Sequence, residues 1–313
     1  MQRRIELLIN EARMESDNLE FTDETGIQTS EFLRWANSAQ TRLASLIQLR
    51  FPQVFQKVKT FQAVLGQEGY NLPADVFYNA RIQQIDYSRT GNDQDYYPLH
   101  QGRLIERLST NPSVPSFYIR RSNSILIQPR PSEAGIFRIT YQKKFAKLDI
   151  RRGTIQAAVL DTVNRTITSM NFDPSLDFDS TVILTEQYMT IVDKDGVVQM
   201  QSIPVTNIDA TTGVITVAPG FVYEEGETIA AGNFGCAGPM STTNSELPDE
   251  AERYLTEMMI WKANKRDSSN DSIEGNEELT KMENEIVDTY SEPSGDIDYV
   301  PVIDGQYGIF ERF

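Results

Sequence analysis

Apolar residues recur at helical spacing near both ends of the chain, and this feature limits the fold more than any other. The three- and four-residue repeat is typical of amphipathic helices and predicts them over 1–15, 29–51, 247–267 and 274–290. Each helix has one apolar face, made by Ile5, Leu8, Ile9 and Ala12; Phe32, Ala36, Ala39, Leu43 and Ile47; Ala251, Tyr254, Leu255, Met258 and Trp261; and Leu279, Met282, Ile286, Val287 and Tyr290. Two hairpins with one-sided apolar faces bury them most simply against each other, so we expect an antiparallel helical bundle.

Between the helical ends, apolar runs are short and turn residues are frequent. From 57 to 149, glycine and proline separate the runs, which is typical of β-strands. In the run IFRITY, Phe137, Ile139 and Tyr141 share one side of a two-residue period, and we expect that side to face a core. One short helix is predicted over 100–108.

Residues 153–240 form a second β-rich block, with turn signals at Asp195–Gly196, Thr212–Gly213 and Glu225–Gly226. We expect a small antiparallel barrel or sandwich, inserted because it separates hairpins that must meet. The predicted fold class is therefore α+β, with a terminal helical bundle, a central antiparallel β unit and an inserted β domain. The expected parts are an N-terminal helical hairpin (1–56), a β unit (57–152), an inserted β domain (153–244), a C-terminal helical hairpin (245–290) and an extended arm (291–313).

The net charge of −16 is unevenly distributed. Residues 1–152 hold 21 Lys and Arg against 16 Asp and Glu, whereas the rest holds 8 against 29. An acidic bulk repels phosphates, which argues against tight DNA binding by the whole chain. No apolar stretch approaches the length of a membrane-spanning helix, and the N-terminus lacks a signal-peptide pattern, so we expect a soluble protein made in the cytoplasm.

The sequence contains few residues of the types that form catalytic sites. The lone histidine, His100, lies in a polar segment, and the lone cysteine, Cys236, has no histidine near it in sequence. The cluster of Asp173, Asp177 and Asp179 lacks the glycine and the closing glutamate of a calcium loop. We expect no catalytic site, cofactor or metal ion, although carboxylates brought together by the fold leave a hydrolase as one alternative.

Basic residues gather at the end of the central β unit. They are Lys143, Lys144, Lys147, Arg151 and Arg152. Aromatic residues interleave with nearby arginines, as in single-strand-binding grooves. The aromatics of IFRITY, however, share a face with Ile139, which favours a core. We therefore predict that the basic residues form a subunit interface with an acidic neighbour.

Three stretches resemble head-to-tail adaptor proteins of tailed bacteriophages, also called head-tail connectors, of the tail tubular protein A type. NLPADVFYNARIQQIDY (71–87) resembles the entry to the family's β unit, and PSFYIRRSNSILIQPRPSEAGIFRITYQKK (115–144) resembles its strand pattern. LPDEAERYLTEMMIWKANKRD (247–267), with the helix after it, is similar to the C-terminal hairpin. The resemblance covers 1–149 and 245–290, and it leaves the block at 153–240 unassigned.

The resemblance implies a structural, non-enzymatic virion protein at the head-tail junction. Such a protein forms a ring, usually of twelve copies, between the portal protein and a tail or nozzle protein, and double-stranded DNA passes through without specific binding. The arm would dock on the portal or a neighbour through Ile297, Tyr299, Val300, Val302, Ile303, Tyr307, Ile309 and Phe310. The resemblance assigns no role to residues 153–244; we expect this block, on the outside of the ring, to contact tail fibres or other tail parts. A β-rich module of a tail or baseplate that binds glycan or another virion protein is the alternative function.

Overall fold

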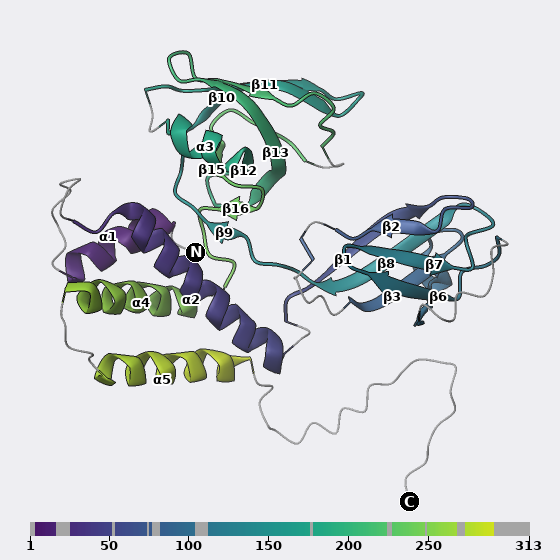
Figure 1. Ribbon diagram of the computed structural model, residues 1–313, viewed down its shortest axis with the longest axis horizontal. Coiled ribbons are helices and arrows are strands. Elements are labelled where there is room, and N and C mark those ends of the chain that lie inside the picture. Colours follow the sequence, from purple (N-terminus) through teal and green to yellow (C-terminus); the bar gives the residue numbers. More distant parts are fainter. Residues whose placement is uncertain are drawn as a thin grey trace, which may run out of the picture.

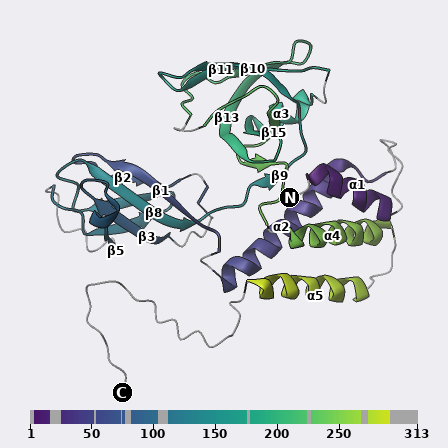
Figure 2. The ribbon, with the colours of Figure 1, turned by 180° about the vertical axis from the view of Figure 1, so that it is seen from behind.

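The computed structural model describes residues 4–16, 26–51, 54–73, 75–76, 82–103, 112–175, 178–223, 227–247, 249–267 and 273–290. These residues form a helical bundle, a central β unit and a second β unit (Figure 1). The view from behind shows the same three parts around a common junction (Figure 2). The expected α+β fold class is confirmed.

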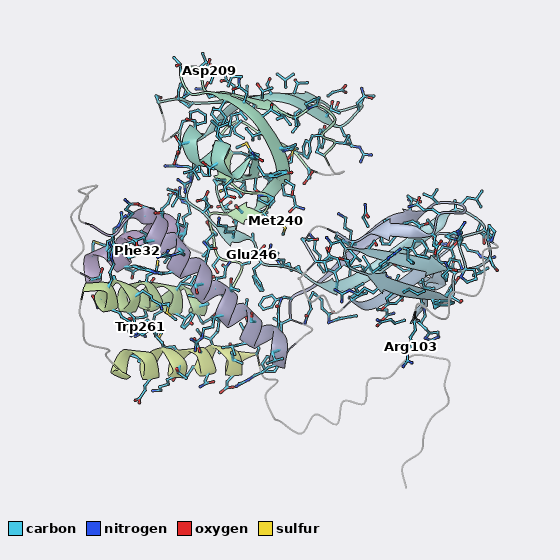
Figure 3. The ribbon with its side chains drawn as sticks, viewed as in Figure 1. Phe32, Arg103, Asp209, Met240, Glu246 and Trp261 are labelled. Atoms are coloured by element: carbon cyan, nitrogen blue, oxygen red, sulfur yellow. The ribbon has the colours of Figure 1, made fainter. Side chains whose placement is uncertain are left out.

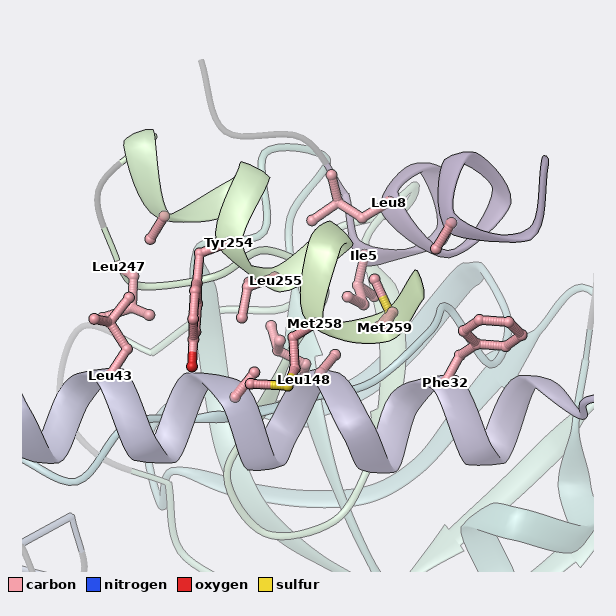
Figure 4. Packing of buried hydrophobic residues seen from close by; sticks show 14 of the residues in the cluster. Ile5, Leu8, Phe32, Leu43, Leu148, Leu247, Tyr254, Leu255, Met258 and Met259 are labelled. Carbon is pink, nitrogen blue, oxygen red and sulfur yellow. The ribbon is translucent and has the colours of Figure 1, made fainter. Parts of the chain in front are cut away.

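Four helices make the bundle: α1 (Ile5–Glu15), α2 (Thr29–Arg50), α4 (Glu250–Asp267) and α5 (Ile273–Thr289). The apolar faces predicted from the sequence meet in one core, in which Phe32, Leu43 and Tyr254 are fully buried. Figure 4 shows side chains of α2 facing those of α4 across this core. Glu31 closes a capping box at Gln28, which fixes the start of α2.

Glu283 is a buried carboxylate that joins three helices of the bundle. The Glu283 carboxylate accepts a hydrogen bond from the Tyr254 hydroxyl at 2.5 Å and pairs with the Arg42 guanidinium at 2.7 Å. Burial, together with the adjacent carboxylate, raises the pKa of Tyr254 well above its ordinary value. The side chains therefore satisfy each other and join α2, α4 and α5.

The central β unit consists of two four-stranded sheets. The first has the order β1-β8-β3-β4, with β1 (Gln56–Ala63), β8 (Gly135–Gln142), β3 (Ile82–Ser88) and β4 (Tyr97–Pro98). The second has the order β2-β7-β6-β5, with β2 (Gly69–Asn71), β7 (Ser124–Gln128), β6 (Phe117–Arg121) and β5 (His100–Gln101). A short 3-10 helix, η1 (Asp93–Asp95), precedes β4.

The core of this unit lies between the two sheets. Phe137, Ile139 and Tyr141 are fully buried, as the two-residue period predicted. Phe137 on β8 contacts Tyr70 on β2, with ring centroids 5.2 Å apart, and so joins the sheets.

The helix predicted over 100–108 is wrong at its start. His100 and Gln101 form strand β5, which pairs in parallel with β6. Sheet pairing with residues far along the chain outweighs the local helical pattern there. Residues 104–108 lie outside the described part of the chain.

The second β unit is a single curled sheet of the order β10-β11-β14-β13-β12-β15. Its strands are β10 (Ile155–Asp161), β11 (Thr166–Phe172), β12 (Tyr188–Val192), β13 (Val198–Asp209), β14 (Val214–Val217) and β15 (Phe234–Ala237). Backbone hydrogen bonds between 152–155 and 232–235 join the two edges at one end of the sheet. The sheet therefore closes partly on itself around an apolar core.

Two of the three turns predicted in this unit are confirmed. Asp195–Gly196 connects β12 to β13, and Thr212–Gly213 connects β13 to β14. Glu225–Gly226 lies outside the described residues. The sequence TVILTE, read as part of a β-rich block, instead forms helix α3 (Ser180–Glu186), because the Asp179 carboxylate caps it by accepting the Val182 amide hydrogen bond.

Candidate functional site

The three parts of the protein meet where the chain crosses between them. Strand β9 (Lys147–Leu148) leaves the central β unit, and β16 (Ser241–Thr242) returns from the second β unit. The two strands pair in parallel, and the Asp149 amide donates to the Thr242 carbonyl at 3.0 Å. Met240 and Glu246, on either side of β16, mark this junction in Figure 3. The junction is the candidate site, because polar side chains from all three parts meet there.

Helix α2 holds the crossing strand with polar side chains. The Asn37 amide group donates to the Leu148 carbonyl and accepts from the Leu148 amide, both at 2.8 Å. Gln40, which is fully buried, donates to the Ala146 carbonyl at 2.8 Å and accepts from the Ser245 hydroxyl at 3.0 Å. These contacts fix the β9 segment along the helix, because a buried polar group without a hydrogen-bond partner would destabilise the folded state.

Arg152 and Asp149 form a buried ion pair at the junction. The Arg152 guanidinium contacts Asp149 at 2.8 Å and Asp179 at 2.7 Å, and the Asp149 carboxylate also accepts the Ala237 amide hydrogen bond at 2.8 Å. Burial alone would lower the pKa of Arg152, but the two carboxylates outweigh it and raise that pKa. The network ties the linker to both α3 and β15.

The structure places the predicted basic residues in different surroundings. Lys143 pairs with Glu246 at 3.0 Å and Lys147 with Glu186 at 3.2 Å, whereas Lys144 is exposed. The Arg151 guanidinium lies 5.0 Å from the centre of the Phe234 ring. Arg152 does not belong to an accessible basic face, because it is only 9% exposed and is bound to the Asp149 and Asp179 carboxylates of its own chain. The subunit interface itself stays a prediction.

A cavity of about 310 Å³ opens beside this junction, between α1 and the start of the second β unit. Its lining includes Glu6, Arg13, Arg151 and Asp179. The Glu6 carboxylate accepts the Arg151 amide hydrogen bond at 2.8 Å, so the lining contains groups of both signs that already have partners within the chain.

The residues weighed for catalysis have structural surroundings. Asp173 bonds Ser175 in a turn, and Asp179 caps α3 and pairs with Arg152. Burial raises the pKa of Cys236 well above its ordinary value, which disfavours a reactive thiolate. His100 is exposed on β5. Among the described residues, no three side chains of the metal-binding types gather into a site; Asp177 lies outside them.

Sequence reasoning missed the residues that build the junction. Gln40 lies one helical turn after Ala36, and this polar residue on an apolar face was the available signal. The predicted docking residues of the arm (Ile297, Tyr299, Val300, Val302, Ile303, Tyr307, Ile309 and Phe310) lie outside the described residues.

The first half of this architecture has a known counterpart. Residues 1–151 match the family model of the SU10 adaptor protein. The matched segment contains α1, α2 and the central β unit, and it ends one residue before Arg152, at the junction. The match supports a phage adaptor, a structural component of the virion. None of the curated proteins matches the chain.

The second β unit and the C-terminal helices lie beyond the matched segment. Helices α4 and α5 nevertheless share one core with the matched helices α1 and α2. Across the described ranges, no helix has both the length and the apolar character needed to cross a membrane.

Proposed function

We propose that the protein is a head-to-tail adaptor that forms a ring, of twelve copies, between the portal protein and a tail or nozzle protein. The observation that carries this proposal is the match of residues 1–151 to an adaptor family, over a segment that supplies half of the bundle and the whole central β unit. Buried contacts between this segment and α4 support one folded scaffold.

The charge of the chain suits a channel for double-stranded DNA. The net charge is −16, and the residues after 152 hold 29 Asp and Glu against 8 Lys and Arg. Acidic walls give phosphates no cations to bind, so DNA would pass without sticking. In the ring, we expect the exposed Lys144 to face acidic side chains of the adjacent copy.

Electron microscopy of the protein alone and with the portal protein of the same phage tests the proposal. We expect rings on the portal, seen as extra density below it. Removal of residues 291–313 should leave a folded chain that no longer joins the ring or the portal. If the full chain forms no ring, either alone or with portal and tail proteins, the proposal is wrong.

We propose a second role for the inserted part, contact with a tail fibre or a surface glycan. It is supported by exposed valines on β10 and the nearby turns: Val159, Val163 and Val222, of which Val163 is 89% exposed. Scattered apolar residues are common on surfaces, so the test is binding itself. Glycan arrays and fibre pull-downs with the full chain, and with Val159→Lys and Val163→Lys, should show binding that the variants lose. Equal binding by the variants would remove this role.

A further inference from the structure

Strand β1 forms an open edge of the central β unit. It is eight residues long and pairs with β8 on one side; on its other side, no strand among the described residues pairs with it. In an antiparallel edge strand, every second residue directs its N–H and C=O groups away from the sheet. Long edges of this kind accept an additional strand, and natural proteins usually cover them.

A groove runs beside the second half of β1, and its lining is mixed, with Lys59, Gln62, Gln67 and Asn71 next to apolar side chains. It encloses about 340 Å³ between β1, the turn after it and β2, which is the edge of the other sheet. Phe61, Val64, Tyr70 and Leu72 line it, and Val64 remains 50% exposed. The two strands lie side by side in both views (Figures 1 and 2). An edge with free ladder positions beside side-chain pockets is the geometry of peptide binding by strand addition.

The segment after α5 begins next to this edge. Tyr290 packs against Phe51 and Phe55, with ring centroids 6.4 and 6.2 Å apart, and Phe55 immediately precedes β1. The described chain therefore ends at Tyr290, next to the start of β1. Attachment at this point gives the segment a high effective concentration at the edge.

The sequence of this segment fits the groove. In DIDYV, residues 296–300, Ile297 and Tyr299 alternate with aspartates, which is the pattern of a half-buried strand. Seven residues separate Tyr290 from Ile297 and span at most about 23 Å, while the six residues from Phe55 to Phe61 span about 20 Å of strand. A segment running parallel to β1 thus brings Ile297 beside the groove.

The two segments carry opposite charge. Residues 291–313 contain five Asp and Glu against one Arg, and β1 contains Lys57 and Lys59. Lys57 already pairs with the Asp75 carboxylate at 2.6 Å, so charge adds only a small part to the match. Pro301 cannot donate a backbone hydrogen bond, so it ends the strand after Val300.

We propose that residues 296–300 add to β1 of the same chain as a parallel strand, with Ile297 and Tyr299 in the groove. The segment then shields the edge of the free protein against pairing with other chains. This inference does not rest on the ring or on the portal, and it fails or holds independently of them.

Disulfide trapping tests the position. Thr60→Cys is combined with Asp296→Cys or Asp298→Cys, which share the outer face of the added strand on either side of Ile297, and the chain's own thiol, Cys236, is buried. Paired strands bring such side chains within disulfide distance. The control pairs Val159→Cys, on the exposed edge strand β10, with Asp298→Cys. We expect the Thr60 pairs to form at least about tenfold more disulfide, the ratio that corresponds to a 1.4 kcal/mol preference.

Mixing ¹⁴N- and ¹⁵N-labelled chains before oxidation identifies which chain supplies the strand. Only intrachain peptides support the proposal; peptides of mixed label would overturn it in favour of exchange between copies, and yields equal to the control would overturn docking altogether.

Hydrogen exchange gives a second measurement in which the folded core is untouched. In the double variant Ile297→Asp with Tyr299→Asp, the outward-facing amide hydrogens of residues 57–63 should exchange with solvent about tenfold faster than in the natural chain. This ratio corresponds to the loss of a 1.4 kcal/mol preference for the docked strand. Ser294→Asp adds charge outside the alternating run and should leave exchange unchanged. Equal exchange in the double variant and the natural chain would refute the docked strand.

Discussion

Replacement of Arg152 by alanine should destabilise the protein at its junction. The Arg152 side chain is 11% exposed and that of Asp149 is 7% exposed, so both charges are removed from water. Breaking such a pair from one side costs about 3–5 kcal/mol, because the remaining carboxylate stays buried without its cation. Asp149 keeps the hydrogen bond from the Ala237 amide, so we expect the loss of stability to lie near the lower end of this range, at about 3 kcal/mol.

Differential scanning calorimetry measures this loss. At roughly 4–8 °C per kcal/mol for a unit of this size, Arg152→Ala should lower the transition of the second β unit by about 12–24 °C. Lys147→Ala is the matched control, because the Lys147–Glu186 pair is half exposed and contributes at most about 1 kcal/mol. Asp149→Asn in the Arg152→Ala background removes the stranded charge and should recover part of the loss. Equal transitions for Arg152→Ala and Lys147→Ala would refute the reasoning.

Three further predictions concern stability. Tyr254→Phe removes a hydrogen bond to the ionised Glu283 and should cost about 1.5–3 kcal/mol in urea unfolding followed by the fluorescence of the two tryptophans, which both belong to the bundle. Gly213→Ala should destabilise the second β unit several times more than Gly220→Ala, as measured by its calorimetric transition. Both glycines have positive φ, but a Cβ at 213 would lie 2.1 Å from a backbone oxygen of β11, whereas no atom lies within 4 Å of a Cβ at 220. Burial raises the pKa of Tyr97 to about 12. The neutral Tyr97 side chain therefore contributes fully to the free energy of unfolding below its unfolded pKa near 10, and this contribution is lost as the pH rises through 12. The urea midpoints at pH 8, 10 and 11 should fall in that order, and equal midpoints would contradict the assignment.

The helices and the core faces of strands could be predicted from the sequence because their signals are local. The stripe through Phe32 and Leu43 and the alternation in IFRITY each lie within one element, and the structure buries both. The junction could not be predicted, since Asn37 binds a carbonyl 111 residues away and Arg152 binds Asp179 across a linker. Helix α3 was missed because a single capping side chain decides between helix and strand in so short a run.

The basic run shows why charge alone misleads. In sequence it predicts one accessible face, but folding brings Glu246, Glu186 and Asp179 to Lys143, Lys147 and Arg152. Partners this distant along the chain are invisible to a local pattern.

The parallel pairing of β9 and β16 has a consequence for how such a gene can change. Lys147 lies opposite Ser241 and Leu148 opposite Thr242, so the chain leaves and re-enters at adjacent strands, about 4.8 Å apart. A recombination event with one breakpoint at each strand would remove or exchange the second β unit, while the helices before and after it could still pack into one bundle. The joint is therefore a place where the unit between the two strands could be exchanged without redesign of the bundle that carries it.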